Sequence, residues 1–386
     1  MKKYRILMFS AVLLYVTYMA AKNIYTSEII EIMRHFGVTK SDASAASSFS
    51  FVTYAAAQLV FVKIIRKLNV RRYLLICSPV SVLLFAAVPF CTDIRQIWMI
   101  FAVLGALLAG VFPVCMLVIS EYLPDELVPA ANAYNGAAFA LSFSLDYFFS
   151  ALFIKIADWR LGFFVFPALY MISVILFCLA FSACERRKTE KAQSAVPGGK
   201  KAAFKYLFFA GSVGFLVNLI YYAVSGWVPN LLSEQFGLTP ALSVLVTLLI
   251  PLTGAAGCVV CLRLCDKHKN AATVISAASA VLSAVLAFVY GSAFPLTLGL
   301  VTVLLFIVRG MAHVFGWQVP VNARRFMDPS SAATAINIFG CIGAAAGPVI
   351  FGAIADANGY APFFIAAAAA AVLMTAAAAA GADTIA

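Results

Sequence analysis

Charged residues are scarce in this chain. Only 11% of its 386 residues are Asp, Glu, Lys or Arg, whereas 64% are hydrophobic. Ordinary soluble domains contain about 25% charged and about 45–50% apolar residues, and a soluble protein of this length needs more polar side chains to cover its surface. The composition therefore excludes a soluble enzyme, a nucleic-acid-binding protein and a disordered chain. It leaves a protein that crosses the lipid bilayer several times.

Motifs of catalysis and of metal or cofactor binding are missing as well. The sequence contains no Walker loop, no serine elbow and no metal-ligand cluster. Its nine cysteines are scattered, and Cys258-Val-Val-Cys261, which has the spacing of a metal or redox pair, is not accompanied by a second pair of that spacing. We interpret that pair as small side chains on one helix face. The sequence predicts no enzyme, no cofactor and no metal site.

Long apolar segments dominate the chain instead. A bilayer core about 30 Å thick needs roughly 20 helical residues. We predict an all-α membrane protein whose twelve spans lie at about 5–33, 43–64, 72–90, 97–119, 133–155, 163–183, 206–229, 241–264, 272–290, 295–320, 332–354 and 362–380. The polar stretch 184–205 divides them six and six. It is therefore predicted to be a cytoplasmic basic linker between two six-helix bundles, at 1–183 and 206–386.

Lysine and arginine gather in alternate loops. If the N-terminus is cytoplasmic, 20 of the 27 basic residues fall on its side of the membrane, and five fall on the other side: Arg34, Lys40, Arg95, Lys155 and Arg160. By the positive-inside rule this bias places both termini in the cytoplasm. We predict a monomeric, multi-pass protein of the cell membrane, either plasma or bacterial inner membrane. Its expected partners are the lipid bilayer and a small-molecule substrate, not nucleic acid.

The six-plus-six layout resembles the major facilitator superfamily, and several segments resemble its organophosphate/phosphate antiporter branch. The first span reads Tyr18-Met-Ala-Ala-Lys22-Asn23 where that branch has Tyr-x-x-Arg-Lys-Asn. The seventh ends Gly226-Trp227-Val228-Pro229 where the branch has Lys-Trp-Ser-Pro. The resemblance implies a substrate site at mid-membrane between the two bundles, which rock to give alternating access.

Four basic positions of that branch are occupied by other residues here, namely Ala21, Gln58, Ala138 and Tyr221. A phosphate dianion taken out of water needs several charge-assisted donors, preferably arginine. We therefore expect no phosphate-ester transport. The sequence favours a secondary active transporter of a small organic anion or polar metabolite, coupled to protons or another ion. A transporter-like membrane sensor that signals to a partner protein is the open alternative.

Three ionisable residues lie deep in predicted spans: Lys22, Asp146 and Arg309. Each costs about 2.5–3.5 kcal/mol on insertion scales if it is unpaired, so each is expected to face the bundle interior or an aqueous cavity. Lys22 and Arg309 are the candidates for binding an anion, and pairing within a bundle or snorkelling of Lys22 is the alternative. Further candidate substrate contacts are Asn23, Gln58 and Tyr221.

Ion coupling needs a group that can gain and lose charge. Asp146 and His313 are the candidates, and His313 lies one turn after Arg309 on the same helix face. Structural pairing is the alternative for both. Glu28 and Glu31, near the external end of the first span, are interpreted as solvated charges.

The loop charges predict a cytoplasmic gate of inverted sign. The superfamily has an aspartate where this chain has Arg66, and an arginine where it has Leu127. We predict that Arg66 and Lys67 pair with acids of the loop between spans 4 and 5, namely Glu121, Asp125 or Glu126. The second half keeps the usual polarity, with Asp266 in one loop and Arg324 and Arg325 in the next. The alternative is that these exposed charges contribute little.

Overall fold

The computed structural model describes residues 1–64, 68–185, 200–319, 323 and 329–385. Helices account for nearly all of these residues, and no strand occurs among them. Eleven helical stretches of this described part are long and apolar enough to cross a membrane. The predicted all-α membrane fold is confirmed, and the chain is a multi-pass membrane protein.

The helices follow one another in the order expected from the apolar segments. Those of the first half are α1 (Lys2–Ser27), the short α2 (Ile29–Phe36), α3 (Lys40–Ile64), α4 (Val70–Ala87), α5 (Ile94–Leu108), α6 (Val111–Glu121), α7 (Val128–Ile156) and α8 (Gly162–Ser182). Those of the second half are α9 (Lys200–Phe236), α10 (Pro240–Thr247), α11 (Leu249–Lys267), α12 (Ala271–Val289), α13 (Phe294–His313), α15 (Pro329–Asn358) and α16 (Tyr360–Ile385). The pairs α5–α6 and α10–α11 each make one membrane-spanning stretch. Most of the predicted linker 184–205 lies outside the described residues.

Helix α3 is the second of the twelve predicted spans. It has 25 residues, enough to cross a bilayer. It is nevertheless not among the eleven stretches that are also apolar enough. Its first half carries five serines, between Ser41 and Ser50. Several of these serines face a cavity inside the protein, which explains why the helix is polar.

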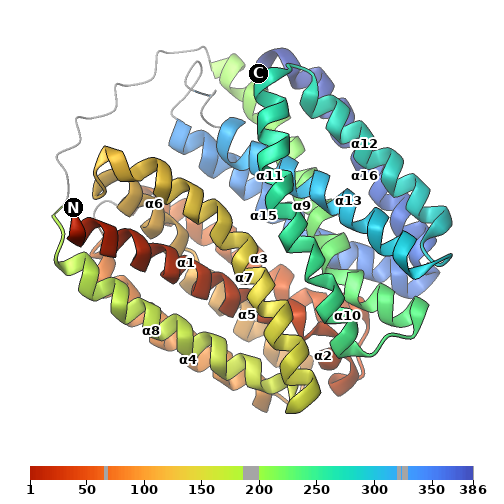
Figure 1. Cartoon of the computed structure of the whole chain (residues 1–386), viewed down its shortest axis with the longest axis horizontal. Coiled ribbons are helices and arrows are strands. Elements are labelled where there is room, and N and C mark those ends of the chain that lie inside the picture. Colours follow the sequence, from red (N-terminus) through yellow and green to blue (C-terminus); the bar gives the residue numbers. More distant parts are fainter. Residues whose placement is uncertain (65–67, 186–199, 320–322, 324–328, 386) are drawn as a thin grey trace.

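The helices pack as two groups in chain order. In the first group α1 packs on α7 and α8, and α4 packs on α8; in the second, α9 packs on α15 and α16, and α11 on α13. Figure 1 shows the red-to-yellow-green first group beside the green-to-blue second group. The groups meet through α3 with α15 and through α7 with α10 and α11. This is the two-bundle arrangement that the sequence predicts.

Glycines allow the closest helix contacts inside the second group. A Cβ atom at Gly343 of α15 would overlap the carbonyl oxygen of Phe215 in α9, and one at Gly347 would overlap that of Leu219. Small residues at such spacings let helix backbones approach each other. The Gly340–Gly347 segment of α15 therefore serves helix packing.

Both chain termini lie at one end of the molecule, and α2 and α10 lie at the opposite end, called here the far end (Figure 1). At the far end Lys40 links the two groups. Its Nζ lies 2.9 Å from Glu234 Oε1 of α9 and 3.3 Å from Asp356 Oδ1 of α15. The backbone N–H of Ser41 also donates to Asp356 Oδ2 at 3.3 Å. These three charged residues form the far-end cluster, and they hold α3 against the second group.

Candidate substrate-binding cavity

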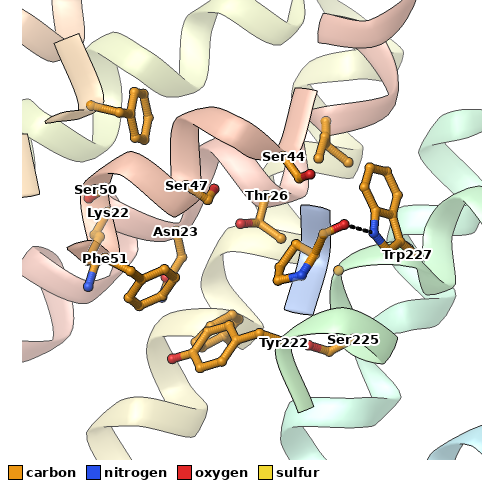
Figure 2. Close-up of a pocket in the computed structure, with 15 residues that line it drawn as sticks. Lys22, Asn23, Thr26, Ser44, Ser47, Ser50, Phe51, Tyr222, Ser225 and Trp227 are labelled. Carbon is orange, nitrogen blue, oxygen red and sulfur yellow. Dashed lines mark hydrogen bonds between the residues drawn. The ribbon is translucent and has the colours of Figure 1, made fainter. Parts of the chain in front are cut away.

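A cavity lies between the two helix groups, where the resemblance predicts a substrate site. About 610 Å³ of space free of protein atoms lies within it and in its opening to solvent. Helices α1 and α3 line one side, and α9 and α15 line the other (Figure 2). Its polar lining consists of Lys22, Asn23, Thr26, Ser44, Ser47, Ser50 and Ser225. Its aromatic lining consists of Phe51, Phe101, Phe143, Tyr222 and Trp227.

Lys22 is the one charged side chain among the described residues that line the cavity. Its Nζ lies 4.5 Å from the ring centroid of Phe51 and 4.4 Å from that of Tyr54. Ring faces attract a cation but leave its charge in place. No acidic side chain in the described part of the chain forms a salt bridge with it. The lysine therefore presents an uncompensated positive charge to the cavity.

Two further residues of the lining could bind the same ligand as Lys22. The side-chain Nδ2 of Asn23 is buried and has no hydrogen-bond partner within the described structure. The Trp227 indole closes the other end of the cavity, where its Nε1 donates to the Pro348 carbonyl at 2.9 Å (Figure 2). Lys22 and Asn23 thus offer positive charge and N–H donors at one end, and an aromatic surface covers the other.

Arg309 does not line this cavity. Its guanidinium Cζ stacks 3.5 Å from the ring centroid of Phe139 on α7 and lies 5.6 Å from that of Tyr221. Three rings, Phe51, Tyr222 and Tyr221, form an aromatic row that separates it from Lys22. The ring centroids of Phe51 and Tyr222 lie 5.0 Å apart, and those of Tyr222 and Tyr221 lie 5.3 Å apart. The two predicted anion-binding cations are therefore held at opposite ends of one row of rings.

Gln58 and Tyr221 are buried outside the cavity lining. The Gln58 side chain donates to Tyr54 Oη at 2.9 Å and accepts from Asn337 Nδ2 at 2.6 Å, so it joins α3 to α15. Tyr221 is 2% exposed and belongs to the aromatic row. Tyr221 packs on the cavity-lining Tyr222, and Gln58 binds Tyr54, whose ring faces the Lys22 ammonium group. Direct substrate contact by either residue stays a prediction.

The predicted coupling residues lie in different helix groups. Asp146 is fully buried in α7, and neither of its carboxyl oxygens has a hydrogen-bond partner within the described structure. His313 ends α13, immediately before a π-helical turn at Val314–Gln318, and stands one turn from Arg309.

The interpretation of Glu28 as a solvated charge is wrong. Its side chain is 0% exposed, and its Oε1 accepts a hydrogen bond from Ser150 Oγ of α7 at 2.8 Å. Glu28 lies where α1 ends and α2 begins. The chain changes direction there and turns this carboxyl inward. Glu31, one turn later, is partly exposed and pairs with Arg34 at 3.3 Å.

The basic residues of the predicted gate, Arg66, Lys67, Arg324 and Arg325, lie outside the described residues, so the gate stays a prediction. Their predicted partners are placed near the end that carries the termini. Glu121 is buried at the end of α6. Asp125 and Glu126 are exposed in the turn that follows, and Asp266 is exposed near the end of α11.

The ion pairs of the far-end cluster were not predicted from the sequence. Lys40 entered the prediction only as one of the five basic residues on the non-cytoplasmic side of the membrane. No local pattern links Lys40 to Glu234 or Asp356, because these acids come from other helices far along the chain. The scarcity of charge was the only available signal, since a lysine and two acids near helix ends have few other partners.

The chain belongs to the Major Facilitator Superfamily, which its residues 11–348 match. It is similar in structure to a bacterial homologue of the human lysosomal transporter Spinster, solved in an inward-facing and unoccupied conformation. The TM-score is 0.80 at 12% identity, over 99% of this chain and 98% of that one. The nucleoside transporter NupG matches with a TM-score of 0.73 at 12% identity, over 97% of this chain and 99% of that one. No curated protein matches the chain in sequence. The resemblance to the organophosphate/phosphate antiporter branch stays a prediction.

Proposed function

We propose that this protein is a secondary active transporter that carries a small organic monoanion across the cell membrane by alternating access, with both termini in the cytoplasm. The observation that carries the proposal is Lys22, a cation in the cavity wall without an acidic partner in the described structure. A charge in the membrane interior is costly unless it is paired. A bound anion would supply the missing partner.

The charge of the cavity favours one negative charge on the substrate. A phosphate ester carries about two charges at neutral pH and needs several cationic donors. Only Lys22 is available among the described lining residues, and Arg309 is stacked on Phe139 beyond the aromatic row. A carboxylate matches a single ammonium group.

The rest of the lining favours a substrate with hydroxyl groups. Five hydroxyl side chains, from one threonine and four serines, surround the cavity between Lys22 and Trp227. Hydroxyls can both donate and accept hydrogen bonds. The aromatic lining provides an apolar surface for carbon atoms. A monocarboxylate that carries hydroxyl groups would contact the Lys22 ammonium group with its carboxylate, the lining hydroxyls with its own hydroxyls, and the aromatic rings with its carbon atoms.

Alternating access requires the two helix groups to separate at one end at a time. The far-end cluster joins α3 to α9 and α15 in this structure. We infer that it closes the extracellular end and that substrate exchange at that end requires these ion pairs to break.

Replacing Lys22 should weaken anion binding. In a thermal-shift screen of the purified protein, gluconate, glycerate or lactate should raise the unfolding temperature, because a ligand bound to the folded state stabilises it. Glycerol 3-phosphate should not. Hydrogen bonds to charged groups contribute about 1.5–3 kcal/mol, so Lys22→Met should weaken binding by about 10- to 150-fold. The matched control Lys155→Met removes an exposed lysine at the end of α7 and should change nothing.

Uridine tests the neutral alternative, since a nucleoside is the substrate named for one structural neighbour. Stabilisation by uridine that survives Lys22→Met, without stabilisation by any of the three carboxylates, would contradict an anion transporter.

A further inference from the structure

A pair of buried carboxyl groups lies in the first helix group, separate from the cavity lining. Glu28, at the junction of α1 and α2, and Asp146, in α7, are both 0% exposed. Ser150 connects them, because it donates to Glu28 Oε1 at 2.8 Å and stands one turn after Asp146 on the same face of α7. Since one helical turn rises about 5.4 Å, Asp146 lies about that far along α7 from the residue that binds Glu28.

This pair lacks the partners that buried acids normally have. Glu28 Oε2 and both carboxyl oxygens of Asp146 have no hydrogen-bond partner in the described part of the protein. The other groups whose charges act on Glu28 are Glu31 and Asp158, which are also acidic. The nearby cation Arg160 is already paired with Asp158 at 2.9 Å. Beside Asp146, the neighbouring titratable group is the neutral phenol of Tyr147.

Ionising both carboxyl groups in this buried interior would cost much free energy. Burial disfavours each charge, and the like charge of the neighbour disfavours both together. A proton removes one charge, and it also supplies the O–H donor that the unpaired carboxyl oxygens lack. We propose that Glu28 and Asp146 together form a proton-binding site, and that the proton bound there is the coupling ion of the transporter.

The position of the pair supports coupling to the cavity. Ile29 directly follows Glu28, and Phe143 lies one turn before Asp146; both line the cavity. An anion in the cavity brings negative charge next to the pair, and negative charge favours the protonated form of a carboxyl. Anion binding therefore promotes proton uptake. The coupling step rests on the proposed function and gives symport of one anion with one proton, which moves no net charge.

The proton site can be tested without any substrate. Infrared spectra of the full-length protein in lipid nanodiscs should contain the C=O band of a buried protonated carboxyl between about pH 5 and about pH 8, a range in which model carboxyls are ionised. Glu28→Gln combined with Asp146→Asn should remove this band. The control Glu31→Gln, on the adjacent helix, should keep it. A wild-type spectrum without the band, or an unchanged band in the double variant, would overturn the proposal.

Coupling is tested by counting protons in a weakly buffered solution. At an alkaline pH at which the substrate-free wild type has lost most of its infrared band, addition of gluconate should cause uptake of up to one proton per gluconate bound. The double variant should bind gluconate within about threefold of wild type, because Lys22 is intact, and take up none. Undiminished uptake by the double variant would overturn the coupling role. Absence of gluconate binding to the wild type would instead count against the proposed substrate, and the infrared result would still decide the proton site.

Two further measurements address a double variant that fails to fold and the alternative that the pair binds Na⁺. If the double variant does not fold, Glu28→Asp and Asp146→Glu keep both acids and should retain the band, whereas Asp146→Asn alone should diminish it. If Na⁺ at constant ionic strength stabilises the wild type but not Asp146→Asn, the pair binds sodium, and the proton proposal is overturned.

Discussion

Replacing Lys40 by methionine is expected to open the far end of the protein. The substitution leaves Glu234 and Asp356 facing each other without the cation that now lies 2.9 and 3.3 Å from them. Removal of one partner of a buried ion pair costs about 3–5 kcal/mol. The Glu234 side chain is 42% exposed and that of Asp356 is 26% exposed, so solvent reduces this to about 1–3 kcal/mol. The population open at the far end should therefore rise about 5- to 150-fold.

The opening can be measured with a cysteine at Ser44, which is buried in the cavity wall. In a chain whose nine native cysteines are replaced, a membrane-impermeant maleimide applied from the far-end side should label Ser44→Cys faster when Lys40→Met is present. Exchanging the charges, Lys40→Glu with Glu234→Lys, should restore part of the protection. Lys155→Met is the control. Equal labelling with and without Lys40 would show that the far-end cluster does not hold this end closed.

Gly343→Ala is expected to destabilise the whole protein. A Cβ atom there would overlap the Phe215 carbonyl oxygen and press on the Leu219 backbone, which cannot move as a side-chain tip could. Overpacking a tight contact typically costs about 1–3 kcal/mol and can cost more. The unfolding temperature in detergent should fall by several degrees, because about 2–4 °C is lost per kcal/mol even in larger domains.

Gly299→Ala provides the matched control in α13. Apart from the adjacent backbone of α13 itself, no atom lies within 4 Å of a Cβ atom at that position. Alanine is the better helix former by about 1 kcal/mol, so this variant should be neutral or slightly more stable. Equal unfolding temperatures for the two alanine variants would contradict the close approach of α15 to α9.

The fold could be predicted largely from the sequence because hydropathy is a local property. A run of apolar residues has to span the bilayer whatever its neighbours are. The placement of Lys22 on a cavity wall also followed from its own position, since a lysine inside a span has few other places to go. Even α3, less apolar than the other spans, corresponds to the apolar segment predicted at 43–64.

The meeting of distant side chains could not be predicted in the same way. Glu28 looked like a solvated charge because it stands near a span end, and only the turn between α1 and α2 directs it toward Ser150. Lys40 meets Glu234 and Asp356 because three helices converge at the far end. Gln58, an expected substrate contact, is held instead by Tyr54 and Asn337. Each arrangement depends on helix packing, which hydropathy does not encode.

The serines of α3 also affect how the protein is made. During synthesis each segment partitions into the bilayer according to its own transfer free energy. By that measure α3 is weaker than the eleven more apolar stretches, so its insertion depends on neighbours that bury its polar face. One neighbour, α5, emerges soon afterwards, but the other, α15, is synthesised only when most of the chain is complete. The polar face of this cavity-wall helix is therefore fully covered only after α15 has been made, and a chain truncated before α15 would leave it exposed to cellular quality control.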